Sequence, residues 1–221
     1  DVERVLQVVR DDRDHLFALP AGAFGFAIEV GAAQGERGLV RQRAEEREVG
    51  GTCLHRGCIP SKALLRPTQV LADAERIPAA ARAITGEVDV AGVLRSRDAF
   101  VDDWDDADQV TWLRKVGATL VRGHGRIAGD RQVAVTTSDG QVRHLAADQG
   151  VVIAIGSRAA FPPIDGLADV NAWDNRHVSE ITQIPRRLIV LGGGAIGVEM
   201  GQAISRLGAE QVTIVEAQKR L

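Results

Sequence analysis

The sequence has little cysteine, few aromatic residues and no excess of positive charge, and each shortage excludes a class of protein. Only two of its 221 residues are cysteine, too few for a small secreted scaffold held together by disulfides. Aromatic residues make up 4% of the chain, tyrosine is absent, and the formal net charge is -3. Proteins that bind nucleic acid are usually basic or offer aromatic rings for stacking, so no nucleic-acid partner is expected.

Long hydrophobic runs are also missing. The longest uncharged run covers residues 16–28 and contains Pro20, Gly22 and Gly25. A helix that crosses a bilayer needs about 20 apolar residues, so no membrane span is expected. Acidic residues crowd the segment before this run, which is unlike a secretory signal. We therefore predict a cytoplasmic protein without a membrane partner.

The first half of the chain favours an α/β protein that begins with an extension. Residues 1–13 are charged and are assigned to that extension. Residues 14–40 resemble the start of a βαβ unit, with a helix over 27–34 and a second strand over 38–40. Helical composition follows over 59–83, interrupted by Pro67 and Pro78, and apolar spacing predicts one long helix over 90–115. That helix carries the acidic run 102–108, for which a solvated helix face is favoured over a metal site.

After Gly117 the pattern changes to strands. Asp139-Gly140 is a strong hairpin turn signal between two of them. A continuous apolar run predicts a strand buried on both faces at 151–155. The last strand–turn–helix–strand unit echoes the one at the start of the chain. The predicted strands are 118–123, 132–137, 141–145, 151–155, 186–192 and 211–216, with a helix over 195–207.

The two cysteines lie in one short segment, GGTCLHRGCIPSK at 50–62. Five residues of regular helix would rise about 7.5 Å, whereas disulfide-bonded Cα atoms lie about 4.4–6.8 Å apart. An irregular turn is therefore needed, and Gly57 is the residue best able to permit it. A helix that starts downstream, and the charge of Lys62, would lower a thiol pKa. Two buried, inert cysteines remain the alternative; zinc would need about four ligands, and no second Cys or His pair is nearby.

The whole segment closely resembles the active-site signature of the class I pyridine nucleotide-disulfide oxidoreductases, which include dihydrolipoamide dehydrogenases, mercuric reductases and glutathione reductases. The resemblance implies that Cys53 is the interchange thiol and that Cys58 is the thiolate in charge transfer with a flavin. It also implies that Gly51 and Thr52 contact FAD phosphates and that Lys62 lies beside the flavin ring.

A second glycine segment, Gly192-Gly193-Gly194-Ala195-Ile196-Gly197, fits GxGxxG between a predicted strand and a predicted helix. In this context the glycines let a pyrophosphate approach the backbone at the helix N-terminus. Glu216 ends the next strand, where an acidic side chain binds a ribose 2′-hydroxyl and would repel a 2′-phosphate. The pattern favours NAD(H) over NADP(H); the alternative is a glycine turn that only packs helix on sheet.

The same resemblance implies further site residues. Glu199 would pair with Lys62 beside the flavin, although a surface helix charge is the simpler alternative. Other residues would contact FAD from two family-like segments, RGHG at 122–125 and AIGS at 154–157, where isoleucine replaces the usual threonine. These residues are His124, Gly125, Ile155, Gly156 and Ser157.

The N-terminal segment departs from the family. Gly22 and Gly25 match the second and third glycines of its FAD motif, but Pro20 stands where the first should be, and proline fixes φ and lacks an N–H. Arg41 falls near an expected ribose-binding carboxylate, with Glu45 or Glu46 as weak substitutes. We hypothesise an altered or frameshifted coding region before Gly50, which resequencing tests.

The prediction is thus an α/β protein with two incomplete Rossmann-like nucleotide-binding domains. Residues 1–165 would form an FAD domain carrying the dithiol, and 166–221 would begin an NAD domain. The chain is expected to lack its true start and the C-terminal interface domain through which family members form homodimers. The expected function is electron transfer between NAD(H) and a small disulfide or dithiol substrate, through FAD and Cys53–Cys58, like dihydrolipoamide dehydrogenase. A mercuric-reductase-like enzyme and an inactive nucleotide-binding fragment are the alternatives.

Overall fold

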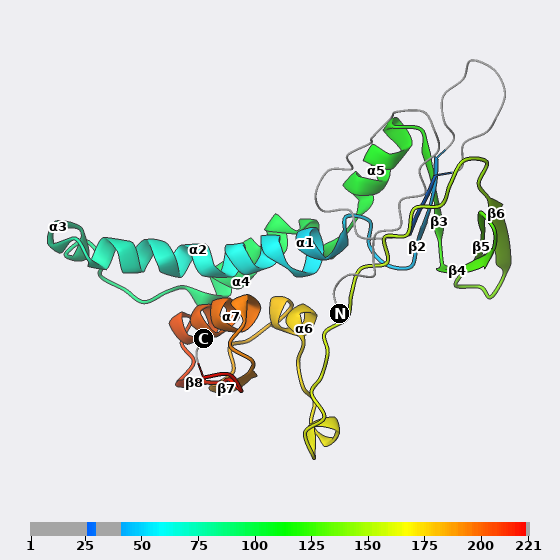
Figure 1. Cartoon of the computed structure of the whole chain (residues 1–221). Coiled ribbons are helices and arrows are strands. Elements are labelled where there is room, and N and C mark those ends of the chain that lie inside the picture. The colour runs from blue at the N-terminus through cyan, green and yellow to red at the C-terminus, as the bar shows by residue number, and fades with distance from the viewer. Residues whose placement is uncertain (1–25, 30–40, 220–221) are drawn as a thin grey trace. The chain divides into compact units, whose positions relative to one another are not determined.

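The computed structural model describes residues 26–29 and 41–219, which fall into two compact units (Figure 1). Unit 1 contains the described residues up to Gly51 together with Asp105–Ser157. Unit 2 contains Thr52–Trp104 and the described residues from Arg158 onward. Among the helices of the described residues, none has both the length and the apolar character that crossing a membrane requires.

Unit 1 holds two three-stranded sheets. In the first, β1 (Phe26–Glu29) runs antiparallel to β2 (Arg41–Glu45), and β2 runs parallel to β3 (Ala118–Arg122). Helix α5 (Ala107–Lys115) leads into β3, and apolar side chains from the two elements share a small core with Val49. The antiparallel meander β4 (His124–Gly129), β5 (Gln132–Thr136) and β6 (Val142–Ala146) forms the second sheet.

The strands predicted at 118–123, 132–137 and 141–145 are confirmed as β3, β5 and β6. The hairpin turn is confirmed as well, because Gly140 adopts a φ of 81°, in the left-handed region that suits glycine. The alternating burial of β5 puts Val133 and Val135 in a common core with Leu145 and Val121. The strand-like runs and the turn signal thus predicted β5 and β6 of this sheet, whereas β4 was not predicted.

Two predictions for unit 1 are wrong. The segment from Ala27 to Glu29, predicted as the start of a helix, belongs to β1 and pairs with β2 at every position from Phe26↔Ala44 to Glu29↔Arg41. Cross-strand pairing overrides local helical composition there. The buried strand predicted at 151–155 forms only a bridge at Val152, and Ile153 and Ile155 are 50% and 58% exposed. An apolar run indicates that a strand would be buried, but it does not identify the strand it would pair with. No strand among the described residues pairs along this run.

Some predicted elements lie outside the described residues. They are the extension 1–13, the glycine turn with Pro20, Gly22 and Gly25, and the strand 38–40.

Unit 2 is built around helix α2 (Cys58–Glu75), which follows the short α1 (Gly51–Arg56). Helices α4 (Val90–Phe100) and α7 (Ala195–Arg206) pack against α2, and α7 also covers the parallel pair β7 (Arg187–Leu191) and β8 (Gln211–Val215), as Figure 1 shows. The core of this unit joins the three helices through apolar side chains. Its buried members are Leu64, Val93, Leu94, Ile181, Met200, Ala203, Ile204 and Leu207.

The strand–helix–strand unit predicted over 186–216 is confirmed as β7, α7 and β8. Its strands are parallel and in register from Arg187↔Gln211 to Leu191↔Val215. A strand–helix–strand crossover between parallel strands is the building block of parallel α/β sheets. The fold class is therefore α/β, as predicted, in an incomplete Rossmann-like form.

The helices of unit 2 differ from prediction in two places. Pro67 lies inside α2 without interrupting it, and only Pro78 marks a boundary, as the first residue of α3 (Pro78–Ala81). The single helix predicted over 90–115 is broken between α4 and α5 by a short 3₁₀ turn η1 (Asp102–Trp104), whose residues have φ between 50° and 67°. Positive φ is uncommon for such residues and is held by tertiary contacts of Trp104, described below. The acidic run is mostly exposed, as expected, but it does not lie on a helix face.

Candidate functional site

The turn between the two cysteines is irregular, as the sequence predicts. Helix α1 ends at Arg56, helix α2 begins at Cys58, and Gly57 between them adopts φ -145° and ψ -104°. A Cβ atom on Gly57 would lie 2.9 Å from the carbonyl oxygen of Thr52, closer than real Cβ contacts allow. Glycine is therefore needed here for space.

This turn brings the two thiols together. Cys53 is partly exposed, Cys58 is exposed, and both are free. A hydrogen bond with the Cys58 side chain, followed by burial and by repulsion from a Cys58 thiolate, raises the pKa of Cys53 above its usual range. The prediction of a lowered thiol pKa is therefore wrong for Cys53, because its neighbouring sulfur outweighs the charge of Lys62. The alternative of two buried, inert cysteines is also wrong as regards burial.

Lys62 and Glu199 form an ion pair, as the resemblance implies. The Nζ atom of Lys62, on α2, bonds to Oε1 of Glu199, on α7, and lies 3.3 Å from the Ser61 hydroxyl oxygen. Burial alone would raise the pKa of Glu199, but hydrogen bonds from Lys62 and Ser61 outweigh it and lower that pKa. Glu199 is thus a carboxylate near neutral pH, and its ion pair with Lys62 ties α2 to α7 just downstream of the dithiol. Its role beside a flavin stays a prediction.

The predicted glycine loop joins β7 to α7. Gly192 has a φ of 106°, which favours glycine, and its N–H donates to the carbonyl of Val215 at 2.8 Å. Gly194 caps α7 in an extended conformation with open space around it. A Cβ atom on Gly197 would lie 2.3 Å from the Gly192 carbonyl oxygen, so the third glycine allows the helix to approach the strand. The backbone amides at this helix start can receive a pyrophosphate.

Glu216 follows β8 directly and reaches back to the glycine loop. Its carboxylate accepts hydrogen bonds from the N–H groups of Gln218 and Gly193, both at 2.7 Å. These backbone hydrogen bonds lower the pKa of Glu216, so it is a carboxylate at neutral pH. The loop, the helix start and this acid therefore lie together at one end of the strand–helix–strand unit, and their binding of a dinucleotide stays a prediction.

The structure divides the remaining predicted site residues between the units. Gly51 and Thr52 open α1, after two glycines at positive φ, Gly50 at 124° and Gly51 at 72°. In unit 1, His124 and Gly125 begin β4, and His124 Nδ1 lies 3.1 Å from Oε2 of Glu46. Exposed, irregular chain in unit 1 contains Ile155, Gly156 and Ser157.

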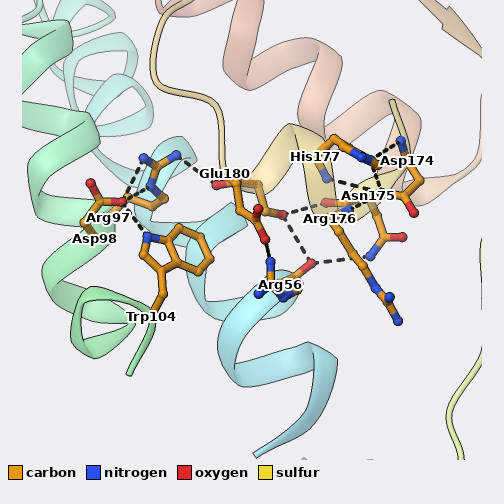
Figure 2. Close-up of polar contacts among 10 residues, drawn as sticks. Arg56, Arg97, Asp98, Trp104, Asp174, Asn175, Arg176, His177 and Glu180 are labelled. Carbon is orange, nitrogen blue, oxygen red and sulfur yellow. Dashed lines mark hydrogen bonds and ion pairs between the residues drawn. The ribbon is translucent and has the colours of Figure 1, made fainter. Parts of the chain in front are cut away.

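A polar cluster that the sequence did not predict surrounds Arg56, the residue before Gly57 (Figure 2). The guanidinium of Arg97, on α4, is 2% exposed and donates to the carbonyls of Ser179 and Ile181 at 2.8 and 2.9 Å. It also pairs with Asp98 at 2.8 Å, and the indole N–H of Trp104 donates to the same carboxylate at 3.2 Å. This contact holds Trp104, and with it the 3₁₀ turn, in place.

The cluster continues to Arg56, the last residue of α1. Arg56 forms an ion pair with Glu180 and lies, like Arg97, over the ring of Trp104. The carbonyl oxygen of Arg56 is 3.2 Å from the hydroxyl of Ser179 and 3.4 Å from the amide nitrogen of Asn175. Both of these residues belong to α6 (Asn175–Ser179), which begins with an Asp174–His177 capping box. No sequence pattern indicated this cluster, because Arg97 and Trp104 lie within the range 90–115 that was predicted as one continuous helix.

Comparison with known protein families gives one clear match. The family model described as pyridine nucleotide-disulphide oxidoreductase matches residues 20–221. Mercuric reductase from Staphylococcus aureus is 29% identical over 213 residues, which cover 96% of this chain and 37% of that protein. Dihydrolipoyl dehydrogenase 3 from Pseudomonas aeruginosa is 34% identical over 209 residues, which cover 93% of this chain and 44% of that protein. The chain thus spans less than half the length of these curated relatives.

Solved structures give the same fold. The HOCl-induced flavoprotein disulfide reductase RclA from Escherichia coli superposes with a TM-score of 0.64 at 21% identity, covering 81% of this chain and 37% of that one. LpdA from Mycobacterium tuberculosis gives a TM-score of 0.63 at 23% identity, with 81% and 39% coverage. At such identities the likeness establishes the fold alone.

Proposed function

The chain belongs to the pyridine nucleotide-disulphide oxidoreductase family, and on that premise we propose that it is part of an FAD-dependent enzyme that exchanges electrons between NAD(H) and a disulfide or dithiol. One observation carries this proposal. The two thiols of Cys53 and Cys58 are hydrogen-bonded across a turn that only glycine permits. Thiols held at this range can close to a disulfide and open again.

We take the roles of the two thiols from the family resemblance and not from exposure, because Cys58 is the more exposed of the two. An incoming dithiol would attack the disulfide at Cys53, form a mixed disulfide with it and release Cys58 as a thiolate. The second thiol of the substrate would then displace Cys53, which leaves an oxidised substrate and a reduced pair.

A nicotinamide dinucleotide fits the second glycine segment. The loop has no side chains at Gly192, Gly193 and Gly194, and Glu216 stands at the end of β8 where a ribose hydroxyl would bind. We propose NAD(H) rather than NADP(H), since the lowered pKa of Glu216 keeps a negative charge there that would repel a 2′-phosphate. Gly192, Gly194, Ala195, Ile196 and Gly197 would line the pyrophosphate.

FAD fits the segment that leads into α1. Positive φ angles at Gly50 and Gly51 leave the backbone free of side chains, so Gly51 and Thr52 would hold FAD phosphates. Lys62 and Glu199 would lie beside the ring, and His124 and Gly125 near the adenine. When bound, FAD would supply the relay of an electron pair between nicotinamide and disulfide. In this reading, 1–165 is the FAD domain and 166–221 begins the NAD domain of a protein that forms homodimers.

Two members of the family suggest two substrates. Dihydrolipoyl dehydrogenase 3 is 34% identical, and the lipoyl dithiol class is therefore our first proposal. Mercuric reductase matches over 96% of the chain, so a mercuric ion is the second. Assays with dihydrolipoamide and with Hg(II), each in the presence of nicotinamide cofactor, separate the two.

The test is a visible absorption spectrum of the purified chain, supplied with FAD, during anaerobic reduction by a dithiol. We expect a long-wavelength absorbance that is absent in Cys58→Ser and retained in a control, Ser205→Ala, on α7. A chain that never retains FAD would refute the enzymatic proposal and leave a nucleotide-binding fragment. A chain that retains FAD but shows the same spectrum in Cys58→Ser would refute the role of the dithiol.

A further inference from the structure

The turn between the cysteines lacks a backbone hydrogen bond that a helix would provide. In a continuous helix the carbonyl of Arg56 would accept from the N–H of residue 60, but residue 60 is a proline and has none. The carbonyl at the end of α1 therefore depends on donors from elsewhere in the chain.

Helix α6 supplies those donors. The hydroxyl of Ser179 lies 3.2 Å from the Arg56 carbonyl and 2.8 Å from the carbonyl of Asn175, and its single proton can serve one of them at a time. The side-chain amide of Asn175, at 3.4 Å, is a second donor to Arg56. Glu180, the residue after α6, pairs with the Arg56 guanidinium. The backbone carbonyl and the side chain of Arg56 are therefore both held (Figure 2).

The holding segment is itself anchored. Arg97 donates to the carbonyls on either side of Glu180, those of Ser179 and Ile181, and Ser179 is only 2% exposed. Arg97 in turn is fixed by Asp98. A buried arginine with several hydrogen bonds is a rigid anchor, because moving it would leave buried polar groups without partners.

We propose that Asn175, Ser179 and Glu180 form a clamp on Arg56 that fixes the backbone between Cys53 and Cys58 and so sets the thiol–disulfide equilibrium of this pair. The inference rests on the proposed redox role of the dithiol and adds positioning residues to it. A fixed backbone keeps the sulfurs close and favours the disulfide. Releasing Arg56 gives the turn conformational freedom that ring closure must then remove, so the disulfide becomes easier to reduce.

The experiment equilibrates the 221-residue chain in mixtures of reduced and oxidised glutathione and measures the disulfide fraction by mass after alkylation of free thiols. In the reaction the two thiols give two electrons and two protons to one glutathione disulfide, which yields the Cys53–Cys58 disulfide and two glutathione thiols. We expect the equilibrium constant for disulfide formation to fall about tenfold in Ser179→Ala/Glu180→Gln, a rise in potential of about 30 mV. Each single variant should lower the logarithm of the equilibrium constant by at least about a third of the change in the double variant.

The controls separate positioning from folding. Glu210→Gln breaks an exposed ion pair with Arg186, 2.7 Å long and outside the clamp, and should leave the equilibrium unchanged. Ser179→Thr keeps the hydroxyl and should restore most of the wild-type value. Thermal unfolding is recorded for every variant, and Glu180→Gln, which keeps the side-chain shape, tests the clamp if the double variant does not fold. Clamp variants that lower the melting temperature but leave the equilibrium constant unchanged would overturn the inference. A wild-type chain that forms no Cys53–Cys58 disulfide would instead refute the proposed function.

Discussion

Unit 2 contains two glycine-dependent turns that lead into helices, and they are held in different ways. The dithiol turn at Gly57 is supported by residues about 120 positions away, since Asn175 and Ser179 bond to the carbonyl of Arg56. The glycine loop after β7 is supported from within its own strand–helix–strand unit, by the carbonyl of Val215 and the carboxylate of Glu216.

The glycine loop is thus supported by residues close to it in sequence, whereas the dithiol turn is supported by residues far from it in sequence. The nucleotide loop forms wherever a parallel strand pair and its crossover helix form, because the glycines and the acid are all part of that unit. The support of the dithiol turn comes from α6, and Arg97 on α4 holds the end of α6 in turn. We therefore expect its geometry to depend on distant substitutions, whereas the nucleotide loop should respond only to changes within 187–216.

The largest effect is expected from Arg97→Leu, which removes the anchor of the distant support. The carbonyls of Ser179 and Ile181 would lose their donor in a buried setting, at a cost of about 2–4 kcal/mol in the free energy of unfolding. Denaturant unfolding followed by circular dichroism measures this loss. Arg95→Leu on the same helix is the matched control, because Arg95 is 72% exposed and should change stability by less than about 0.5 kcal/mol. Equal effects of the two substitutions would show that the long-range support contributes nothing.

The same difference between local and distant support explains which features could be predicted from the sequence. The strand–helix–strand unit was predicted in every element, since the apolar runs, the glycine spacing and the position of Glu216 all lie in consecutive residues. The dithiol was predicted as well, and so was the need for Gly57. The clamp was not, because hydrogen bonds between Arg56 and α6 depend on packing that no local pattern encodes. Residue type did not indicate the burial of Arg97 either, since arginine is seldom fully buried.

The incorrect predictions have the same physical origin. The long helix over 90–115 breaks because Trp104 bonds to Asp98, a contact that helical spacing could not reveal. The thiol pKa was predicted from the helix and Lys62, while the contact with Cys58 dominates Cys53. Local sequence gave the correct element types in the β5–β6 hairpin and in the β7–α7–β8 unit, but not at β1 or at the break between α4 and α5.

A smaller effect is expected from a substitution within the nucleotide loop. In Gly197→Ala the new Cβ would collide with the Gly192 carbonyl, so helix and strand must move apart, which costs about 1–3 kcal/mol. Binding of NADH, followed by its fluorescence, should weaken at the same time, while the Cys53–Cys58 equilibrium in glutathione buffers stays as in the wild type. Gly201→Ala on the same helix is the control, since its Cβ would meet Val212 at an ordinary 3.5 Å. A dithiol equilibrium that shifts in Gly197→Ala would contradict the independence of the two turns.

The smallest effect is expected from protonating Glu216, which probes the local support without altering any packing. The pKa of this carboxyl is lowered from 4.5 by backbone hydrogen bonds, so its stabilising effect is fully present above pH 4.5 and is lost as the pH falls through the lower folded-state pKa. Glu216→Gln keeps the shape and an acceptor oxygen but never carries the charge. The melting temperature of the wild type should therefore exceed that of Glu216→Gln near pH 7, and the difference should shrink below pH 4.5. A difference that persists unchanged in acid would mean that the carboxylate charge does not hold the Gly193 amide, and that the loop is supported by its strands alone.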